Sequence, residues 1–389
     1  MPALEDISGL VAEVIPTVID LRRQLHTQPE PAHREFVTTD MVRSALETEG
    51  LEFRTRGEKT GGWVDVGATP KVGFRADLDA LPIVEPTDNS PRSANQGWMH
   101  ACGHDAHTAI AVGLATILHR LAPDIGVRFL FQPGEESNPG GAIELVAEGA
   151  VTGLDSLIAF HVDPSLRVGR IGARVGPITG SADSFTIEVH GPGGHTSRPH
   201  RTVDLVDAAS RVVTGLTTAV RRSVDARSAL VIAFGSIHGG DAPNVIPTEV
   251  VMTGTVRTLD PALWDVLPGL IDKALGSILA LPGAGYTMDY QQGIPPVVND
   301  EFVIETTTVA IESTIGAGTV VPTAQSMGGE DFSNYLTVTR GALLRLGTAS
   351  GGGDLHSAGF RLNEESIPIG LQAGAAALLA LVDASRGDG

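Results

Sequence analysis

Short apolar segments alternate with helical stretches along the first 180 residues, and this alternation limits the folds open to the chain. Lys71–Phe74, Val127–Phe131 and Leu157–Phe160 are short apolar runs typical of buried strands. Between them, Thr108–Leu121 and Gly141–Gly149 have the pattern of helices. Strands that alternate with helices predict an α/β fold, in which a mainly parallel sheet is flanked by helices on both faces.

The pattern changes near Ser181, where longer β-rich segments replace the short apolar runs. The segments that follow form an α+β pattern: Phe185–His190, Val203–Val220, Ala229–Ile237, Thr248–Arg257 and Pro261–Leu279. Residues 291–296 (QQGIPP) resemble a linker that returns the chain to the first domain. We therefore expect a discontinuous catalytic domain of residues 1–180 and 292–389, and an inserted α+β domain of residues 181–291.

Composition narrows the classes of partner. The chain has 27 basic and 46 acidic residues and a net charge of −19, which argues against nucleic-acid binding and against an anionic membrane surface. No apolar run approaches the roughly 20 residues that span a bilayer. Residues 1–20 have no basic start and no small-residue cleavage site, so we expect no secretory signal and a cytoplasmic location.

Three of the expected strands end in side chains that bind metals or transfer protons. Asp77 and Asp79 follow the first strand, Glu135 and Glu136 follow the second, and His161 follows the third. The carboxyl ends of parallel strands meet at one edge of a sheet, where open α/β folds bind their ligands. Any one of these strand ends could be an ordinary solvated terminus, but the three together predict a functional site.

A cluster of potential metal ligands lies between the first two of these strands. Residues 100–107 (HACGHDAH) contain three histidines, an aspartate and Cys102, the single cysteine of the chain, at the start of a helical stretch. Such a density of His, Cys and Asp suits a metal site better than a hydrophobic core. Gly103 permits a tight backbone turn, so Cys102 and His104 could face one ion.

The adjacent residues Glu135 and Glu136 suggest two different roles, metal binding and proton transfer. In an extended segment, Glu135 and Glu136 would point in opposite directions, so that one could bind a metal while the other faces the water to be activated. A rival hypothesis makes Cys102 a nucleophile paired with a histidine. That hypothesis leaves Glu136, His161 and the aspartates without a role.

Taken together, these motifs resemble the M20 metallopeptidase family, in its branch of aminoacylases, hippurate hydrolases and auxin-conjugate hydrolases. The resemblance covers nearly the whole chain. It rests on residues 73–82 (GFRADLDALP), 99–107 (MHACGHDAH), 131–136 (FQPGEE), 193–200 (GGHTSRPH), 244–247 (NVIP) and 329–332 (GEDF). The cysteine-containing block is specific for this branch, and His26, Pro29, Glu30 and Glu35 also resemble its N-terminal motif.

The resemblance implies a site and a cofactor. The positions that match the ligands of a two-metal centre are Cys102, His104, Glu136, His161 and His356. Two divalent ions per chain are implied, and zinc, manganese, cobalt and nickel all suit these ligands. Glu135 matches the general base and acid, and Asp77 and Asp105 match residues that orient the ligands.

The resemblance also assigns roles to the insert. His195 matches a histidine that stabilises the oxyanion and acts across a dimer, while Asn244 and Arg257 match residues that hold the substrate. The insert is then a lid and dimerisation domain, and a homodimer or higher homo-oligomer is expected.

The implied reaction is hydrolysis of the amide bond of small N-acyl amino acids to a carboxylic acid and a free amino acid. Two departures from the family pattern, at residues 91–98 (PRSANQGW) and at Ser357–Ala358 after His356, could reshape the substrate pocket. A dipeptidase or carboxypeptidase would use the same metals. A metal-binding protein without activity is a further alternative, which the presence of Glu135 argues against.

Overall fold

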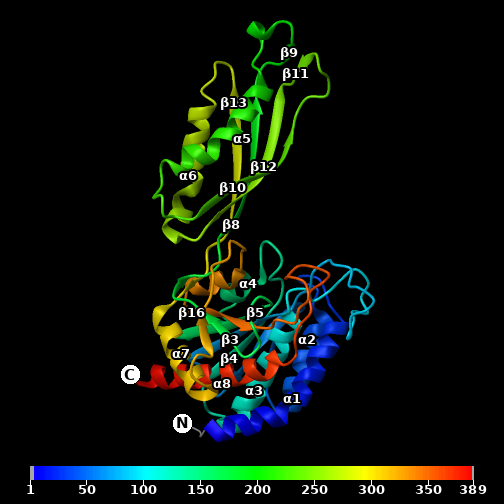
Figure 1. The fold of residues 1–389 in the computed structure, drawn as a ribbon, viewed down its shortest axis with the longest axis vertical. Coiled ribbons are helices and arrows are strands. Elements are labelled where there is room, and N and C mark those ends of the chain that lie inside the picture. Colours follow the sequence, from blue (N-terminus) through cyan, green and yellow to red (C-terminus); the bar gives the residue numbers. More distant parts are fainter. Residues whose placement is uncertain (1–3, 388–389) are drawn as a thin grey trace. The chain divides into compact units, whose positions relative to one another are not determined.

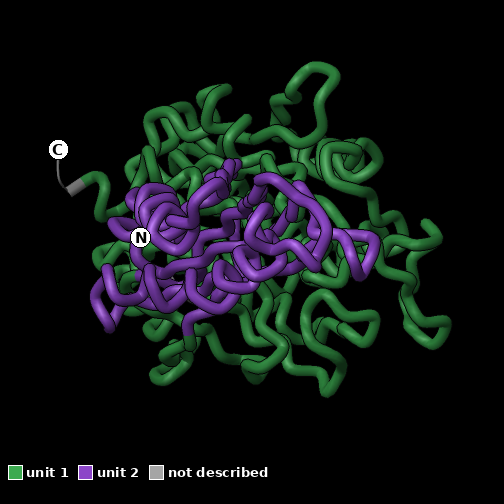
Figure 2. The backbone as a smooth tube through the Cα atoms, turned by 90° about the horizontal axis from the view of Figure 1, so that it is seen from above, with its two compact units in different colours: residues 1–176, 298–324, 331–389 green, residues 177–297, 325–330 purple. Residues whose placement is uncertain are grey.

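The computed structural model describes residues 4–387, with the side chains of residues 7–386. Residues 1–3, which belong to the N-terminal segment assessed for a secretory signal, lie outside the described residues. The chain forms two compact units (Figure 2). Unit 1 comprises residues 1–176, 298–324 and 331–389, and unit 2 comprises residues 177–297 and 325–330.

Unit 1 is built on an eight-stranded sheet with the strand order β1-β2-β4-β3-β5-β16-β6-β15. Its strands are β1 (Phe53–Arg56), β2 (Lys59–Val66), β3 (Val72–Asp77), β4 (Val127–Gln132), β5 (Ser156–Asp163), β6 (Ile171–Ala173), β15 (Val320–Pro322) and β16 (Arg340–Gly347). The four central strands β4, β3, β5 and β16 are parallel, as the alternation predicted. The sheet as a whole is mixed, because β1, β2 and β6 each form an antiparallel pair.

Helices cover both faces of this sheet (Figure 1). They are α1 (Leu4–Thr27), α2 (Phe36–Thr48), α3 (His104–Leu121), α4 (Gly141–Ala147), α7 (Glu301–Ile315), α8 (Ser366–Gly387) and the 3₁₀ helix η2 (Asp331–Thr337). Alternation along the strands sends Phe74, Phe129 and Phe160 into one hydrophobic core with side chains of α1, α3 and α8. On the other face, Arg75 of β3 forms an ion pair with Asp331 of η2. The α/β fold class expected from the sequence is therefore confirmed.

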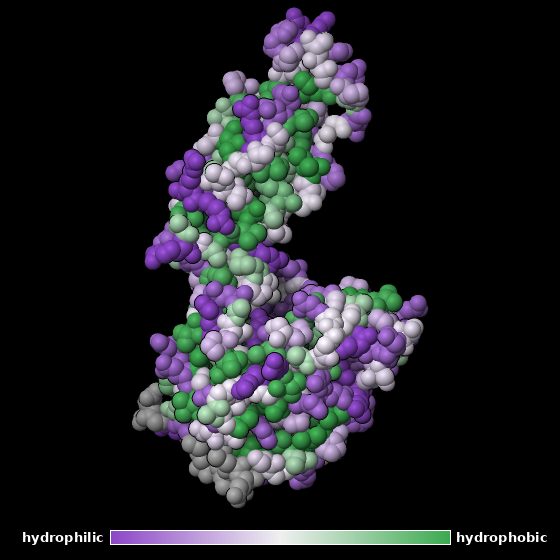
Figure 3. All heavy atoms as spheres, in the orientation of Figure 1, coloured by the Kyte–Doolittle hydropathy of each residue, from purple (hydrophilic) through white to green (hydrophobic). Residues whose placement is uncertain are grey.

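Helix α8 is the one helix among the described residues that is long and apolar enough to cross a membrane. It packs against α1, α3 and α7, and 67% of its most apolar window is buried. Its hydrophobicity is therefore that of a core helix. In the view of Figure 3, hydrophilic and hydrophobic residues are interspersed over the visible surface of each unit.

Unit 2 contains a four-stranded antiparallel sheet with the order β10-β12-β8-β13. Its elements are β8 (Ala182–His190), β9 (Gly194–His195), η1 (Pro199–Arg201), α5 (Leu205–Arg221), β10 (Leu230–His238), β11 (Val245–Ile246), β12 (Glu249–Thr258), α6 (Pro261–Ile278) and β13 (Gly285–Ile294). Buried and exposed residues alternate along β8, as expected of a sheet covered on one face. The buried side chains pack with α5 and α6 into a core of unit 2's own.

The boundaries of the units lie close to the expected ones. Unit 2 begins at Pro177 and its main segment ends at Val297, where residues 181 and 291 were expected. The short strands β7 (Gly176–Pro177) and β14 (Val298–Asn299) lie where the chain passes between the units. Residues 325–330, expected in the catalytic domain, belong to unit 2, because the N–H of Ser326 donates to the carbonyl of Ile178 and the N–H of Gly180 donates to the carbonyl of Gly328.

Candidate metal centre

The carboxyl ends of three adjacent strands of unit 1 supply the frame of the site. Asp77 ends β3, Gln132 ends β4, and His161 lies near the end of β5. Because β4, β3 and β5 are neighbours in the sheet, the residues that follow them meet at one edge.

A glycine directs the ligand cluster toward this edge. Gly103 has a φ of +82° and immediately precedes α3, which begins at His104. A Cβ atom at this glycine would lie 2.5 Å from a methyl group of Val162, next to His161 on β5. Both the backbone conformation and the space therefore require glycine, as the sequence suggested.

The thiol of Cys102 lies between two histidines. Its Sγ atom is 3.4 Å from Nε2 of His161 and 3.3 Å from Nε2 of His356. Two groups of potential metal ligands share this thiol: Cys102 with His104 and His161, and Cys102 with Glu136 and His356. In each group the ligand atoms lie within 4.8 Å of one another. One sulfur common to two candidate ligand groups is compatible with two neighbouring ions.

Hydrogen bonds fix which ring nitrogens face the thiol. Nδ1 of His104 donates to the backbone carbonyl of Asp79 at 2.8 Å, and Nδ1 of His161 donates to the carbonyl of Val162 at 2.8 Å. The Nε2 atoms of both rings are left as lone-pair donors. Nε2 of His104 is buried and has no hydrogen-bond partner among the described residues. A buried imidazole lone pair without a partner fits a metal ligand.

The glutamates lie in a turn, so the prediction that they point in opposite directions is wrong. Strand β4 ends at Gln132, and Gly134 has a φ of +61°, which turns the chain before Glu135. Oε1 of Glu136 lies 3.1 Å from Nε2 of His356, and carboxylate oxygens of Glu135 and Glu136 each lie 3.9 Å from Nε2 of His104. The two carboxylates therefore converge on the ligand cluster.

Asp79 holds this turn, a role that no sequence pattern indicated beyond its place at a strand end. Its two carboxylate oxygens accept the backbone N–H groups of Glu135 at 3.0 Å and Glu136 at 2.9 Å. Its own carbonyl accepts from His104. Asp79 thus links His104, a candidate metal ligand, to the glutamate turn. Its position two residues after Asp77 was the available signal, since alternate residues of an extended segment share one side.

The two aspartates expected to orient ligands behave differently. Oδ1 of Asp77 accepts from Nδ1 of His107 at 2.7 Å, and Oδ2 lies 3.7 Å from Nε2 of His104. Burial opposes ionisation of Asp77, but His104, His107 and Arg75 hold its pKa well below the usual value. Nε2 of His107 accepts the backbone N–H of Val162 at 2.9 Å. Both nitrogens of His107 are therefore used, and this ring is not a free ligand.

Asp105 does not orient a ligand directly, contrary to expectation. Its Oδ2 atom accepts from Nδ1 of His26 and pairs with Nε of Arg22, both at 2.8 Å. Nε2 of His26 in turn donates to Glu85 at 2.9 Å. Since Arg22 and His26 belong to α1, the carboxylate of Asp105 fastens the first turn of α3 to α1.

The environment of Cys102 argues against the nucleophile hypothesis. The thiol is buried, and this burial raises its pKa to about 12. Nucleophilic cysteines have lowered pKa values and accessible sulfur atoms. A buried thiol among imidazoles and carboxylates is better suited to bind a metal.

The remaining predicted residues lie in unit 2. Strand β9 pairs with β11 so that His195 lies opposite Val245, and the N–H of Thr196 donates to the carbonyl of Asn244. His195 and Asn244 are thus neighbours. Arg257 lies near the end of β12, away from the β9–β11 ribbon, and its Nη1 atom donates to the carbonyl of Met327 at 3.2 Å. The structure brings His195 and Asn244 together but not Arg257.

The ring of exposed His195 is held in one tautomer. Its Nδ1 atom accepts from the backbone N–H of Ser197 at 3.1 Å and lies 2.8 Å from the Ser197 hydroxyl. The proton is therefore assigned to Nε2, which suits a hydrogen-bond donor to a developing negative charge.

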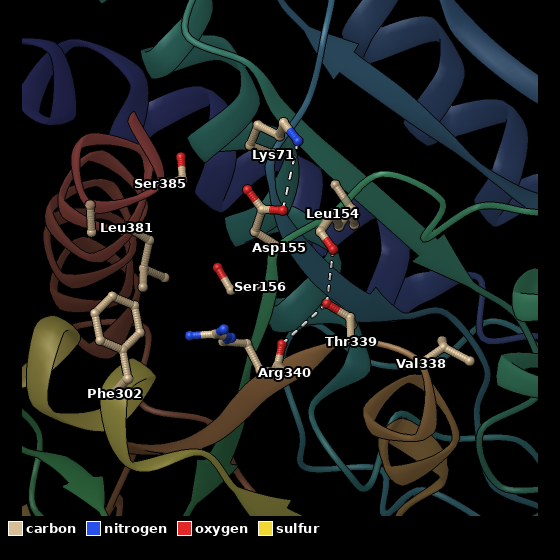
Figure 4. Close-up of a pocket in the computed structure, with 11 residues that line it drawn as sticks. Lys71, Leu154, Asp155, Ser156, Phe302, Val338, Thr339, Arg340, Leu381 and Ser385 are labelled. Atoms are coloured by element: carbon tan, nitrogen blue, oxygen red, sulfur yellow. Dashed lines mark hydrogen bonds and ion pairs between the residues drawn. The ribbon is translucent and has the colours of Figure 1, made fainter. Parts of the chain in front are cut away.

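A separate cavity of about 660 Å³ lies at the amino ends of the strands (Figure 4). It is lined by Lys71, which immediately precedes β3, and by Ser156 and Arg340, which begin β5 and β16. Lys71 faces Asp155 at 3.7 Å, and the guanidinium of Arg340 lies over the ring of Phe302. This cavity is at the opposite ends of the strands from the ligand cluster and is not part of the metal centre.

Comparisons with known proteins agree with this geometry. Residues 73–380 match the model of peptidase family M20/M25/M40. The crystal structure of a dinuclear metal-binding peptidase of the M20 family from Bacillus subtilis is similar, with a TM-score of 0.84 and 31% identity over 96% of this chain and 99% of that one.

Three curated relatives are similar in sequence. An N-acyl-L-amino acid amidohydrolase of Geobacillus stearothermophilus is 40% identical over 76% of this chain and 81% of its own length. An N-acetyl-L-cysteine deacetylase of Bacillus subtilis is 35% identical over 90% of this chain and 84% of its own length. A candidate glutamate–cysteine ligase of Rhodococcus jostii is 41% identical over 91% of this chain, which spans only 45% of that protein. With the family model matched over most of its length, the chain belongs to peptidase family M20/M25/M40 and is a hydrolase of amide bonds.

Proposed function

We propose that the protein hydrolyses N-acyl amino acids to a carboxylic acid and a free amino acid, with two divalent ions held by Cys102, His104, Glu136, His161 and His356. The observation that carries this proposal is the thiol of Cys102 between His161 and His356, with both glutamates converging on the same cluster. When bound, two such ions supply Lewis acidity, which acidifies water and polarises a carbonyl group.

Glu135 is the proposed general base and acid. Its carboxylate lies within 3.9 Å of Nε2 of His104, and its backbone is held by Asp79. A carboxylate so placed can take a proton from the attacking water and then donate it to the departing amine. The same turn supplies Glu136, so one backbone segment positions both a metal ligand and the proton-transfer group.

Residues of unit 2 are proposed to bind the substrate. The Nε2–H of His195 would donate to the oxyanion, and Asn244 or Arg257 would hold the substrate carboxylate. The backbone hydrogen bond between Thr196 and Asn244 supports joint action of His195 and Asn244. These roles require unit 2 to act as a lid, either over its own chain or over a second copy.

A homodimer is proposed through unit 2. Strand β10 is an edge of the antiparallel sheet, and its residues Val231 and Ile237 are exposed, as is Val245 in β11. An edge strand with exposed apolar side chains is prone to pair with another copy. We also propose a cytoplasmic location, without a nucleic-acid or membrane partner, in keeping with the net charge of −19.

The names of the relatives support the substrate class. One acts on N-acyl-L-amino acids and another on N-acetyl-L-cysteine, so N-acetyl-L-cysteine is the first substrate to test. Residues 91–98 and Ser357–Ala358 depart from the family pattern and could reshape the substrate pocket, so the preferred acyl group has to be measured.

The test is a metal-reconstitution assay. Metal would be removed with a chelator and zinc, manganese, cobalt or nickel restored separately. Release of amino acid would then be measured from N-acetyl, N-benzoyl and longer N-acyl amino acids and from unblocked dipeptides. Metal-dependent release from the acylated set, lost in Glu135→Gln, supports the proposal. Release mainly from dipeptides would indicate a dipeptidase or carboxypeptidase instead.

A further inference from the structure

Three successive backbone N–H groups of the glutamate turn donate to buried carboxylates. Those of Glu135 and Glu136 donate to Asp79, and that of Gly134 donates to Oε1 of Glu35 at 2.7 Å. Glu35 comes from a distant part of the chain, immediately before α2. The turn that carries the proposed base and a proposed metal ligand is therefore held from two sides.

The carboxylate of Glu35 is fully buried, and both of its oxygens accept hydrogen bonds. Besides Gly134, it accepts the backbone N–H of His33 at 2.9 Å and the hydroxyl of Thr60 at 2.6 Å. Burial is the main cause of the raised pKa of this carboxyl group, and the nearby Asp79 adds to it. A buried carboxylate that the fold retains at this cost is expected to have a specific task.

Glu35 is itself held firmly. Its backbone carbonyl accepts both the N–H and the hydroxyl of Thr39, and the Thr39 hydroxyl accepts the N–H of Gly61 on β2. The backbone of Glu35 is thus held against α2 and β2. Its side chain can therefore hold the N–H of Gly134 in one place.

A second contact from the same loop limits the turn further. The ring of His33 lies against Gly134, where a Cβ atom would be 2.6 Å from Nε2 of His33, and this Nε2 lies 3.0 Å from the hydroxyl of Ser137. The loop before α2 therefore meets the glutamate turn at both Gly134 and Ser137.

We propose that Glu35 is a positioning residue, which holds Gly134 so that Glu135 and Glu136 point at the metal cluster. The inference rests on the proposed function for the roles of Glu135 and Glu136. It extends that function to a residue that touches neither the ions nor the substrate.

Two substitutions at Glu35 separate hydrogen bonding from charge. In Glu35→Ala, the buried N–H of Gly134 and the partly buried N–H of His33 lose their acceptor, so the turn is expected to shift. In Glu35→Gln, the amide oxygen can accept both N–H groups while the amide NH₂ donates to the hydroxyl of Thr60, so the turn is expected to remain.

Glu30 supplies a matched control. Its carboxylate also accepts two backbone N–H groups near the start of α2, those of Val37 at 3.1 Å and Thr38 at 2.8 Å, but it makes no described contact with the glutamate turn. Glu30→Ala therefore removes a comparable pair of hydrogen bonds from the same region. It should reduce thermal stability without affecting the turn.

The first readout is metal affinity, measured by competition of Zn²⁺ between the protein and a chromogenic chelator. Because Glu136 lies on the turn, Glu35→Ala is expected to weaken zinc binding about 10- to 100-fold, the usual effect of losing an outer partner of a metal site. Glu35→Gln and Glu30→Ala should bind zinc with an affinity within about threefold of that of the unchanged protein, because substitutions that leave a site intact usually change free energies only slightly. Unaltered zinc affinity in folded Glu35→Ala would overturn the proposal.

The second readout is turnover at saturating metal. A displaced base costs about 10²-fold in rate, so Glu35→Ala is expected to lower kcat while changing KM little, and Glu35→Gln should restore kcat. Equal loss of kcat in Glu30→Ala would also overturn the proposal, since it would indicate general destabilisation. If the unchanged protein cleaves no N-acyl amino acid, the proposed function fails, but the zinc competition still tests the role of Glu35.

Discussion

Nε2 of His356 lies 3.3 Å from Sγ of Cys102, although the two residues are 254 positions apart in the sequence. His356 has a φ of +58°, a conformation that residues other than glycine rarely adopt. Its backbone N–H donates to the carbonyl of Ala101 at 3.0 Å, which ties this loop to the segment that carries the thiol. The candidate ligand group of Cys102, Glu136 and His356 therefore depends on a loop from a distant part of the sequence.

Replacing His356 should remove one ion rather than both. His356→Ala leaves the group of Cys102, His104 and His161 complete, whereas the group with Glu136 loses a ligand. We expect bound metal, measured by elemental analysis after gel filtration, to fall from two ions per chain toward one, with loss of turnover. His238→Ala, at an exposed position of β10, is the control and should keep both ions. Two tightly bound ions in His356→Ala would contradict the assignment.

Replacing the thiol by a hydroxyl should change metal preference. Cys102→Ser keeps the size of the side chain but replaces a soft ligand with a hard one. We expect zinc affinity to fall at least about tenfold and manganese affinity to fall less. Parallel titrations with the two metals measure the ratio. Under the nucleophile hypothesis, the chelated enzyme would retain activity that alkylation of Cys102 abolishes, and this result would refute a metal role for the thiol.

Asp79 should be sensitive to a nearly isosteric change. In Asp79→Asn, one side-chain oxygen can still accept an N–H from the glutamate turn, but the amide NH₂ faces the other N–H. A buried unpaired N–H costs about 1–3 kcal/mol. We expect a lower thermal midpoint and a kcat reduced more than KM is raised. Asp88→Asn, on an exposed carboxylate, is the control and should leave kcat unchanged. Full kcat in Asp79→Asn would remove Asp79 from the positioning network.

The His26 network should make stability depend on pH in a defined direction. Burial lowers the pKa of His26, but hydrogen bonds with Asp105 and Glu85 outweigh burial and raise it. Its stabilising effect is therefore complete below the unfolded-state pKa of about 6.5 and is lost as pH rises through the folded-state pKa. The thermal midpoint of His26→Gln should fall further below that of the unchanged protein at pH 6 than at pH 9. An equal difference at both pH values would contradict a charged His26.

The stabilising effect of Asp105 should depend on pH in the opposite direction to that of His26, and it should be lost at low pH. Burial opposes its ionisation, but Arg22 and His26 hold its pKa far below the usual range. Its contribution is present above the unfolded-state pKa of about 3.9 and declines as pH falls further. We expect the thermal midpoint of Asp105→Asn to depend less on pH below about pH 4 than that of the unchanged protein, as followed by circular dichroism at saturating metal. Parallel pH profiles would show that Asp105 is not ionised in the fold.

Local sequence patterns predicted much of the fold and part of the site. The β/α alternation identified the parallel centre of the sheet, because buried strands and amphipathic helices leave distinct periodicities. It did not reveal that β1 and β2 are an antiparallel hairpin, so the sheet is mixed rather than mainly parallel at its edge. Residues 325–330 join unit 2 through a few backbone hydrogen bonds, which leave no periodic pattern.

Within the site, local sequence patterns identified only those residues that cluster in the sequence. Cys102 and His104 stand out by density, whereas His356 lies in an ordinary polar loop and was identified only by family resemblance. Glu35 belongs to a motif that the sequence showed, but it meets the glutamate turn through the backbone N–H of Gly134, a contact that no side-chain motif indicates. Glu135 and Glu136 were found, but their directions were predicted wrongly because the turn at Gly134 was not anticipated.

The most direct test of the central claim is amino-acid release from N-acetyl-L-cysteine by the zinc- or manganese-loaded protein and by Glu135→Gln, with bound metal measured on the same samples. We expect two ions per chain in both proteins, turnover that requires metal in the unchanged protein, and a loss of at least about 10²-fold in the variant. Turnover by the chelated protein, or undiminished turnover by Glu135→Gln with both ions bound, would contradict the account.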